Sequence, residues 1–166
     1  MQYNDSGREA RAIIVSCLLF TGGLSQALAA EPVPPGDPAV ERGRYLVQIG
    51  GCNDCHTPGY MVQNGGVPEA LWLTGSPVGW TGPWGTTYAS NLRLVADGLS
   101  ETRWLKYARR EWRPPMPFFN LRSMTDADLM AIYRYLRYVG PAGEAMPAAL
   151  PPGVEPDGPA FRAPSP

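Results

Sequence analysis

Histidine and cysteine are scarce in this sequence, which has one histidine and three cysteines among 166 residues. A single histidine excludes metal centres that need two or more imidazoles from this chain. No carboxylate pair and no nucleophile–base set is recognisable. The sequence therefore gives no support for substrate turnover by the chain itself, and we predict that it is not an enzyme.

The sequence also has no large excess of either charge and no long apolar run. The chain has 14 basic and 15 acidic residues, which gives a net charge of −1. This balance does not indicate binding to nucleic acid or to a membrane surface. The mostly apolar segment 12–28 is interrupted by Thr21-Gly22-Gly23, so its unbroken part is shorter than the ~20 residues of a spanning helix. We therefore expect membrane contact only through partner proteins.

Residues 1–29 are typical of a secretory signal peptide. Arg8 and Arg11 precede the apolar segment, and Ala27-Leu28-Ala29 supplies a cleavage site. The mature chain is then expected to begin at residue 30, in the periplasm. A retained membrane anchor and a lipoprotein site at Cys17 are the alternatives.

The central feature is the run Cys52-Asn53-Asp54-Cys55-His56, which reads C-x-x-C-H. This spacing is the signature for covalent attachment of a c-type haem. Two cysteines could each form a thioether with a vinyl group, and His56 would then bind the iron from one side. A bare C-x-x-C could also be half of a zinc site or a redox dithiol. A zinc site would need two more ligands, and Cys17 is the only other cysteine. A redox dithiol would usually lie in a βαβ unit, and no such pattern surrounds the motif. We therefore predict one haem c, covalently bound through Cys52 and Cys55.

The second axial ligand of such a haem must be something other than histidine, because His56 is the only one. The methionines beyond the signal segment are Met61, Met116, Met124, Met130 and Met146. Met116 is preceded by Pro114-Pro115 and followed by Pro117, and this restricted backbone lowers the entropy lost on holding a thioether near the iron. We predict that Met116 is the ligand, with Met124 as the alternative. Met116 could also be an ordinary core residue, or the sixth position could be open.

Three helices are predicted, at residues 38–49, 101–112 and 126–139. Each follows a residue suited to an N-cap and ends near glycine or proline, and each has apolar residues at helical spacing. Gly43 lies inside the first helix, where glycine is costly. We interpret it as a point of close contact with another helix.

The remaining segments are rich in glycine and proline. Residues 30–37 are predicted to be a linker, and residues 38–139 the folded domain. Within it, residues 57–88 are expected to form an irregular loop wrapped around the haem, without strands. The tail, residues 140–166, has little periodicity and is expected to be either disordered or packed as an extended strap.

In this order, the motifs resemble those of a class I cytochrome c of the exported bacterial monohaem type. They are similar to those of the cytochrome subunits of bacterial alcohol and aldehyde dehydrogenases. The stretches that carry the resemblance are Gly43-Arg44-Tyr45-Leu46-Val47, Cys52 to His56, Tyr88-Ala89-Ser90-Asn91-Leu92, Met116-Pro117 and Tyr133-Arg134-Tyr135-Leu136.

The resemblance implies an all-α fold, in which three main helices and long irregular loops surround a covalently bound haem. The first and last helices would cross at Gly43, against Tyr133 or Tyr135. The loop 80–91 would cover the haem edge. The candidates for contacts with the haem propionates are Trp84, Tyr88, Asn91 and Arg93.

A haem iron with both axial positions filled suits one-electron transfer better than bond chemistry. We therefore predict a protein that carries single electrons between a redox donor and an acceptor, such as a dehydrogenase or a terminal oxidase. A haem-based ligand-binding sensor and a cytochrome subunit of a dehydrogenase complex are the alternatives. Residues 93–137 contain nine basic and five acidic residues. This excess indicates either a docking surface for an acidic partner or ordinary solvated helix faces.

Overall fold

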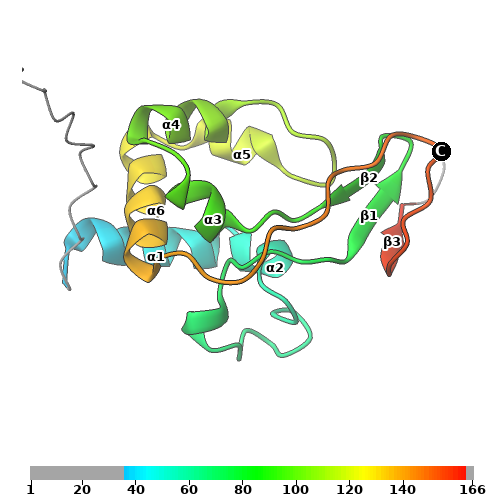
Figure 1. Cartoon of the computed structure of the whole chain (residues 1–166). Coiled ribbons are helices and arrows are strands. Elements are labelled where there is room, and N and C mark those ends of the chain that lie inside the picture. Colours follow the sequence, from blue (N-terminus) through cyan, green and yellow to red (C-terminus); the bar gives the residue numbers. More distant parts are fainter. Residues whose placement is uncertain (1–35, 164–166) are drawn as a thin grey trace, which may run out of the picture. The chain divides into compact units, whose positions relative to one another are not determined.

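The computed structural model describes residues 36–163, so the predicted signal peptide and most of the predicted linker lie outside the described residues. Figure 1 shows the elements, which are α1 (Pro38–Ile49), α2 (Cys52–His56), the 3₁₀ helix η1 (Glu69–Leu71), β1 (Gly79–Gly82), β2 (Gly85–Tyr88), α3 (Leu92–Asp97), α4 (Glu101–Arg109), α5 (Phe118–Ser123), α6 (Asp126–Val139) and β3 (Ala160–Arg162). None of the helices within this range is long and apolar enough to cross a membrane.

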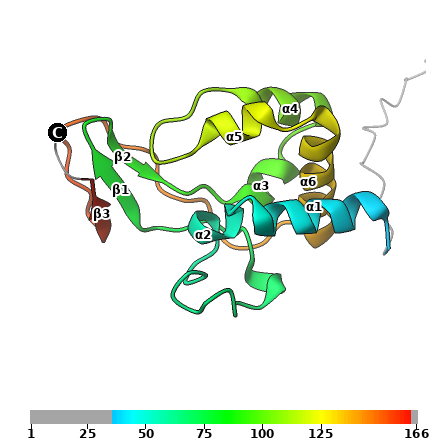
Figure 2. The same cartoon turned by 180° about the vertical axis from the view of Figure 1, so that it is seen from behind.

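The first and last long helices, α1 and α6, cross in contact with each other, as both views show (Figures 1 and 2). A Cβ atom on Gly43 would lie 2.0 Å from the carbonyl oxygen of Ala131 and 2.8 Å from Cβ of Tyr135. Only glycine fits such a crossing, because any larger residue would push the helices apart. The predicted close contact at Gly43 is therefore confirmed, and Tyr135 is the aromatic residue that packs there.

Helix α4 is shorter than predicted, because it ends at Arg109 and not at residue 112. Arg110 adopts an extended conformation, and its guanidinium lies 4.5 Å from the ring of Tyr107 and 3.5 Å from that of Trp112. Trp112 thereby folds back onto Tyr107, with 4.7 Å between the rings. Because α4 ends early, Trp112 packs back against the helix and is not part of a further helical turn.

The prediction of an all-α fold needs correction, because the chain also forms a three-stranded sheet in the order β2-β1-β3. Strands β1 and β2 form an antiparallel hairpin inside the segment that was expected to be irregular, and β3 pairs with β1 in parallel. The hairpin contains threonine and aromatic residues, which favour strands. The glycines at both ends of β1 and at the start of β2 are typical of loops, so the sequence does not show a clear strand pattern. The second neighbour of β1 comes from the tail, which no local pattern could indicate.

The tail lies against the rest of the domain, so of the two predicted alternatives the packed strap is the one observed for residues 141–163, the C-terminal strap. Its backbone pairs with β2, where the amide of Leu150 donates to the carbonyl of Thr86 at 2.8 Å and the carbonyl of Leu150 accepts from the amide of Thr86 at 3.1 Å. Farther back, the side-chain amide of Asn91 donates to the carbonyls of Ala142 and Glu144 at 2.7 and 3.1 Å. The strap passes close to the hairpin and α3 (Figure 1).

Candidate cofactor site

A cavity of about 510 Å³ is lined on one side by α2 and on the other by the chain between α4 and α6. This volume falls within the range of about 300–1,000 Å³ that is usual for cofactor sites. Much of the wall is aromatic, with contributions from Trp80, Tyr88, Trp104, Tyr107 and Trp112. The wall could therefore hold a large, flat, apolar group.

Helix α2 places the predicted attachment residues on this wall. Gly51 precedes the helix with a φ of +67°, a conformation that glycine adopts without strain. The turn that follows brings Cys52, Cys55 and His56 to the cavity, and neither cysteine is in a disulfide. We call the residues from Gly50 to His56 that line the cavity the cysteine–histidine wall.

The two thiols are in an environment that does not activate them. Burial raises the pKa of Cys52 to about 11, and burial likewise raises the pKa of Cys55. A redox dithiol normally has a cysteine with a lowered pKa, which keeps it reactive near neutral pH. Within residues 36–163, no group of three or more histidine, cysteine, aspartate and glutamate side chains is arranged to hold a metal ion. The site therefore fits covalent attachment better than the zinc and dithiol alternatives.

A hydrogen bond from the ring of His56 to the backbone fixes its tautomer. Its Nδ1 lies 2.7 Å from the carbonyl oxygen of Ser90. A carbonyl only accepts, so Nδ1 carries the proton and Nε2 keeps its lone pair. Burial lowers the pKa of His56, which favours the neutral ring. No hydrogen bond to Nε2 occurs within residues 36–163, so this nitrogen is free to bind a metal ion.

Behind α2, a short chain of hydrogen bonds fixes the motif to the loop that follows it. Thr57 Oγ1 donates to Asn53 Oδ1 at 2.7 Å and accepts from the amide of Leu73 at 2.8 Å. The amide of Gly75 donates to the carbonyl of His56 at 2.7 Å. Asn53 and Thr57 are both buried. These bonds hold α2 in place and so fix the direction of the imidazole ring.

Of the residues that the structure describes, two methionines line the cavity, Met116 and Met124. The Cε of Met124 lies 3.7 Å from the point where a Cβ on Gly50 would be, and Cys52 Sγ lies 3.8 Å from the same point. Met124 thus belongs to the neighbourhood of the first cysteine, whereas Met116 comes from the proline-bounded loop. Both predicted candidates reach the cavity, and ligation by Met116 stays a prediction.

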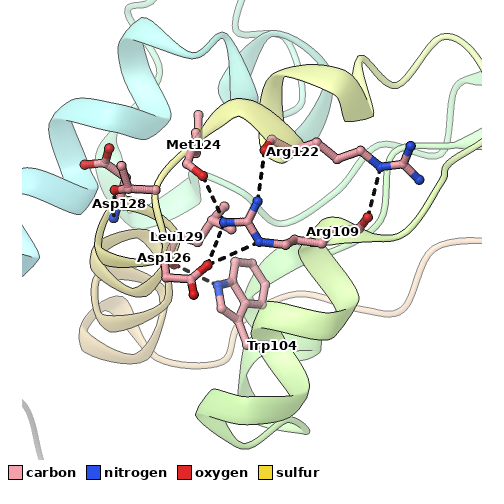
Figure 3. Close-up of polar contacts among 8 residues, drawn as sticks. Trp104, Arg109, Arg122, Met124, Asp126, Asp128 and Leu129 are labelled. Atoms are coloured by element: carbon pink, nitrogen blue, oxygen red, sulfur yellow. Dashed lines mark hydrogen bonds and ion pairs between the residues drawn. The ribbon is translucent and has the colours of Figure 1, made fainter.

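The turn that carries Met124 is held by Arg109, as Figure 3 shows. The guanidinium of Arg109 donates to the carbonyls of Arg122 and Met124 at 3.0 and 2.9 Å, and it pairs with Asp126 at 2.6 Å. Trp104 Nε1 donates to the carbonyl of Leu129 at 2.8 Å in the same junction. The junction of α4, α5 and α6 is therefore tied at several points.

Of the four residues predicted to contact propionates, the structure brings Tyr88 to the cavity. Asn91, Arg93 and Trp84 do not belong to the cavity lining within residues 36–163, and their side-chain donors have partners in the protein. The guanidinium of Arg93 donates to the carbonyls of Gly140, Val139 and Ala70, which joins α3 to the end of α6. Their contacts with propionates stay predictions.

Sequence reasoning missed Trp112 and Arg110, which line the cavity just before residues 113–117, the Met116 loop. Trp112 Nε1 is buried, and it has no hydrogen-bond partner in the described part of the chain. Such a donor at a cavity wall indicates an acceptor from a bound group, because buried donors are rarely left unpaired. The carboxylates of a haem would supply one, with Arg110 beside it. The signal in the sequence was the run Arg110-Glu111-Trp112-Arg113 next to Met116.

Comparison with known proteins found two relatives. The chain is 33% identical over 135 residues to the gluconate 2-dehydrogenase cytochrome c subunit of Pantoea cypripedii, covering 68% of this chain and 29% of that protein. It is 28% identical over 137 residues to one of the subunits of nicotinate dehydrogenase from Pseudomonas putida, covering 74% of this chain and 11% of that protein.

No family model and no solved structure matches the chain. The chain spans less than a third of the length of either relative. Of the predicted resemblance to cytochrome subunits of alcohol and aldehyde dehydrogenases, the similarity to a dehydrogenase cytochrome c subunit is supported. The alcohol or aldehyde type and the assignment to class I stay predictions. The similarity to a cytochrome c subunit, together with the C-x-x-C-H motif on a cavity wall, supports a cytochrome that binds haem c and transfers electrons.

Proposed function

We propose that this protein is a monohaem cytochrome c of the class I type, exported to the periplasm, that carries single electrons between redox partners. One haem c would occupy the cavity of about 510 Å³, joined to Cys52 and Cys55, with His56 and Met116 as its axial ligands. The observation that carries the proposal is the bond of 2.7 Å between His56 Nδ1 and the Ser90 carbonyl, on the same wall as both thiols.

When bound, the haem supplies the one-electron chemistry. The chain's own residues orient the group and control its surroundings. The carbonyl of Ser90 holds the His56 ring and makes the lone pair of Nε2 a stronger metal ligand. The aromatic wall would exclude water, and Trp112 Nε1 and Arg110 would bind the carboxylates of the haem at the cavity wall. A methionine thioether on the other side raises the reduction potential relative to a second histidine.

A dehydrogenase is the proposed electron donor, because both relatives are named as parts of dehydrogenases. The chain would act as a separate carrier or as the cytochrome subunit of such a complex, and it would pass electrons to a further redox protein, with a terminal oxidase as one candidate. Residues 101–123 contain six basic and two acidic residues, so an acidic docking surface on the partner is proposed. Electron-transfer rates that do not fall as the salt concentration rises would contradict this docking mode.

The experiment is to express the full chain in a bacterium that attaches haem c and to examine the purified protein. Haem should stay with the polypeptide on a denaturing gel, and Cys52→Ala combined with Cys55→Ala should abolish that signal. The ferric protein should show the weak near-infrared band of methionine-ligated haem. Met116→Leu should remove this band, and the matched control Met124→Leu should keep it.

Two results would overturn the proposal. If the wild-type chain carries no covalent haem, the cofactor assignment is wrong. If it carries a high-spin haem whose reduced spectrum shifts with carbon monoxide, the sixth position is open, and the protein is a ligand-binding haem protein instead of an electron carrier.

A further inference from the structure

We propose that the C-terminal strap and the β1–β2 hairpin together clamp the Met116 loop. In this arrangement, residues far from the haem-attachment motif set the strength of the methionine–iron bond and the reduction potential. Thr87, Arg113 and Leu150 are the positioning residues. The inference rests on the proposed function, because it needs a haem with Met116 as a ligand.

The loop is bonded to the hairpin at Arg113 and Pro114, shortly before Met116. Thr87 Oγ1, in β2, donates to the carbonyl of Pro114 at 2.8 Å. The guanidinium of Arg113 donates to the carbonyl of Trp84, at the hairpin turn, at 3.3 Å. Pro115 and Pro117 restrict the backbone on both sides of Met116, so holding residues 113–114 also limits where the thioether can lie.

The same arginine connects the loop to the strap. Arg113 also donates to the carbonyl of Leu150 at 3.3 Å, and the amide of Leu150 is bonded to the carbonyl of Thr86 at 2.8 Å. The backbones are close, since a Cβ on Gly85 would lie 2.2 Å from the carbonyl oxygen of Leu150. The loop, the hairpin and the strap therefore meet at Leu150.

The strap is anchored on both sides of that point. Toward its beginning, Asn91 holds the carbonyls of Ala142 and Glu144. Toward its end, β3 pairs with β1, and Phe161 packs on Trp80 with 4.7 Å between the rings. Trp80 lines the cavity, as do Pro147 and Ala149 of the strap between these anchors. The strap thus forms part of the cavity wall and also braces the hairpin that holds the loop.

A clamp of this kind has a functional consequence because the thioether competes with other ligands for the iron. Groups around the axial ligands tune the potential of a haem. If the clamp is loosened, hydroxide, whose concentration rises with pH, should replace Met116 on the iron at a lower pH, and the potential should fall. If the strap only stabilises the fold, the methionine–iron bond should not respond to these contacts.

The test uses three single variants of the haem-loaded full chain. Thr87→Val removes the hydroxyl bound to Pro114 while keeping a β-branched side chain. Arg113→Gln removes the guanidinium bonds, and Leu150→Pro removes the amide bonded to Thr86 without shortening the strap. Thr81→Val is the matched control, because its Oγ1 bonds to Thr86 Oγ1 at 2.8 Å inside the hairpin and does not contact the loop.

The measurements are the reduction potential and the pH midpoint at which the ferric methionine–iron band disappears. Thr87→Val and Leu150→Pro each remove one hydrogen bond, which should weaken the methionine–iron equilibrium by up to roughly tenfold and so lower that midpoint by up to about one pH unit. Arg113→Gln removes two bonds and should have at least as large an effect. The potential should fall in the same variants, and Thr81→Val should match the wild type.

Failure of the clamp is distinguishable from failure of the proposed function. A wild-type protein without the band would contradict methionine ligation itself. A wild-type protein with the band, and clamp variants with its midpoint and potential unchanged, would overturn the clamp alone. An equal shift in Thr81→Val would also overturn it, because the effect would then come from the stability of the hairpin.

Discussion

The two walls of the cavity are built in different ways. The cysteine–histidine wall comes from consecutive residues, Gly50 to His56, and the imidazole side chain itself has one outside hydrogen bond, to the carbonyl of Ser90, while Leu73 and Gly75 hold the turn behind it. The opposite wall combines the Met116 loop, the hairpin and the strap, which lie far apart in the sequence. The proposed attachment site is therefore mainly a local property of the chain, whereas the position of Met116, the proposed second ligand, depends on the whole fold.

This difference explains what each kind of change should do. Under the proposed function, a change at the cysteine–histidine wall, or in α1 just before it, would act on whether the haem is attached to α2. A change at the opposite wall would act on the reduction potential and ligation of the haem once it is attached. Substitutions at the contacts that hold each wall in place should therefore lower the free energy of unfolding by different amounts.

Gly43→Ala should have the largest effect on the free energy of unfolding, because it disrupts the helix crossing that positions α1 and hence the cysteine–histidine wall. The added methyl would lie 2.0 Å from the carbonyl oxygen of Ala131, so α1 and α6 must separate. Overpacking of this kind should lower the free energy of unfolding by about 3 kcal/mol. Urea denaturation followed by far-ultraviolet circular dichroism measures it.

Gly98→Ala is the control for this variant. A Cβ there would meet the nearest atom, the carbonyl oxygen of Leu94, at 3.6 Å, which is ordinary contact. Its φ of −81° suits alanine, so the free energy of unfolding should change by less than about 1 kcal/mol. Equal stability of the two alanine variants would show that the crossing at Gly43 does not support the wall.

The local wall was also the part of the site that could be predicted from the sequence. The C-x-x-C-H motif requires only one turn of chain, and the helices follow from caps and apolar spacing around residues such as Asp37 and Thr125. The need for close packing at Gly43 could be predicted because a glycine inside a helix requires a reason.

The opposite wall could be predicted only in part. Met116 stands out because of its prolines, but the pairing of Trp80 with Phe161 joins strands from distant parts of the sequence, and no periodicity reveals it. The resemblance makes Arg93 and Asn91 candidates for propionate contacts, which stay predictions, and in the structure their donors bind backbone carbonyls at the end of α6 and in the strap. A polar residue in a loop does not reveal from its type alone whether it faces a cofactor or a carbonyl.

Asn91 offers a smaller perturbation that acts on the strap. Its Oδ1 accepts from the amides of Arg93 and Leu94 and so caps α3, while its Nδ2 holds Ala142 and Glu144. Asn91→Ala should lower the free energy of unfolding by about 1–2 kcal/mol, because both functions are lost. Amide hydrogen exchange should then rise across residues 142–150.

Asn91→Asp separates the two functions, because a carboxylate keeps the cap but cannot donate to the two carbonyls. It should increase exchange in residues 142–150 as much as the alanine variant does, while α3 stays protected. If exchange in the strap is unchanged in both variants, the strap does not depend on Asn91, and its anchors lie at Leu150 and β3.

The smallest effect concerns Tyr135, which supports the cysteine–histidine wall through its contact with α1. Its hydroxyl donates to Glu69 Oε1 at 2.9 Å, and Arg44 of α1 binds the same carboxylate at 2.9 Å. Burial, and then the bond to Glu69, raise the pKa of Tyr135 well above its ordinary value of about 10. In the unfolded chain the phenol ionises above about pH 10, while in the folded protein it stays protonated.

The wild-type protein should therefore lose stability as the pH rises past 10, by about 1 kcal/mol per pH unit from this group. Tyr135→Phe removes the titrating group and also one hydrogen bond, so the variant should be less stable at pH 8 and should approach the wild type by pH 11. Urea denaturation at both pH values measures the gap. A gap that stays constant would mean that Tyr135 ionises equally in both states, and that the contact between Glu69 and Tyr135 does not brace the wall that carries the haem-attachment motif.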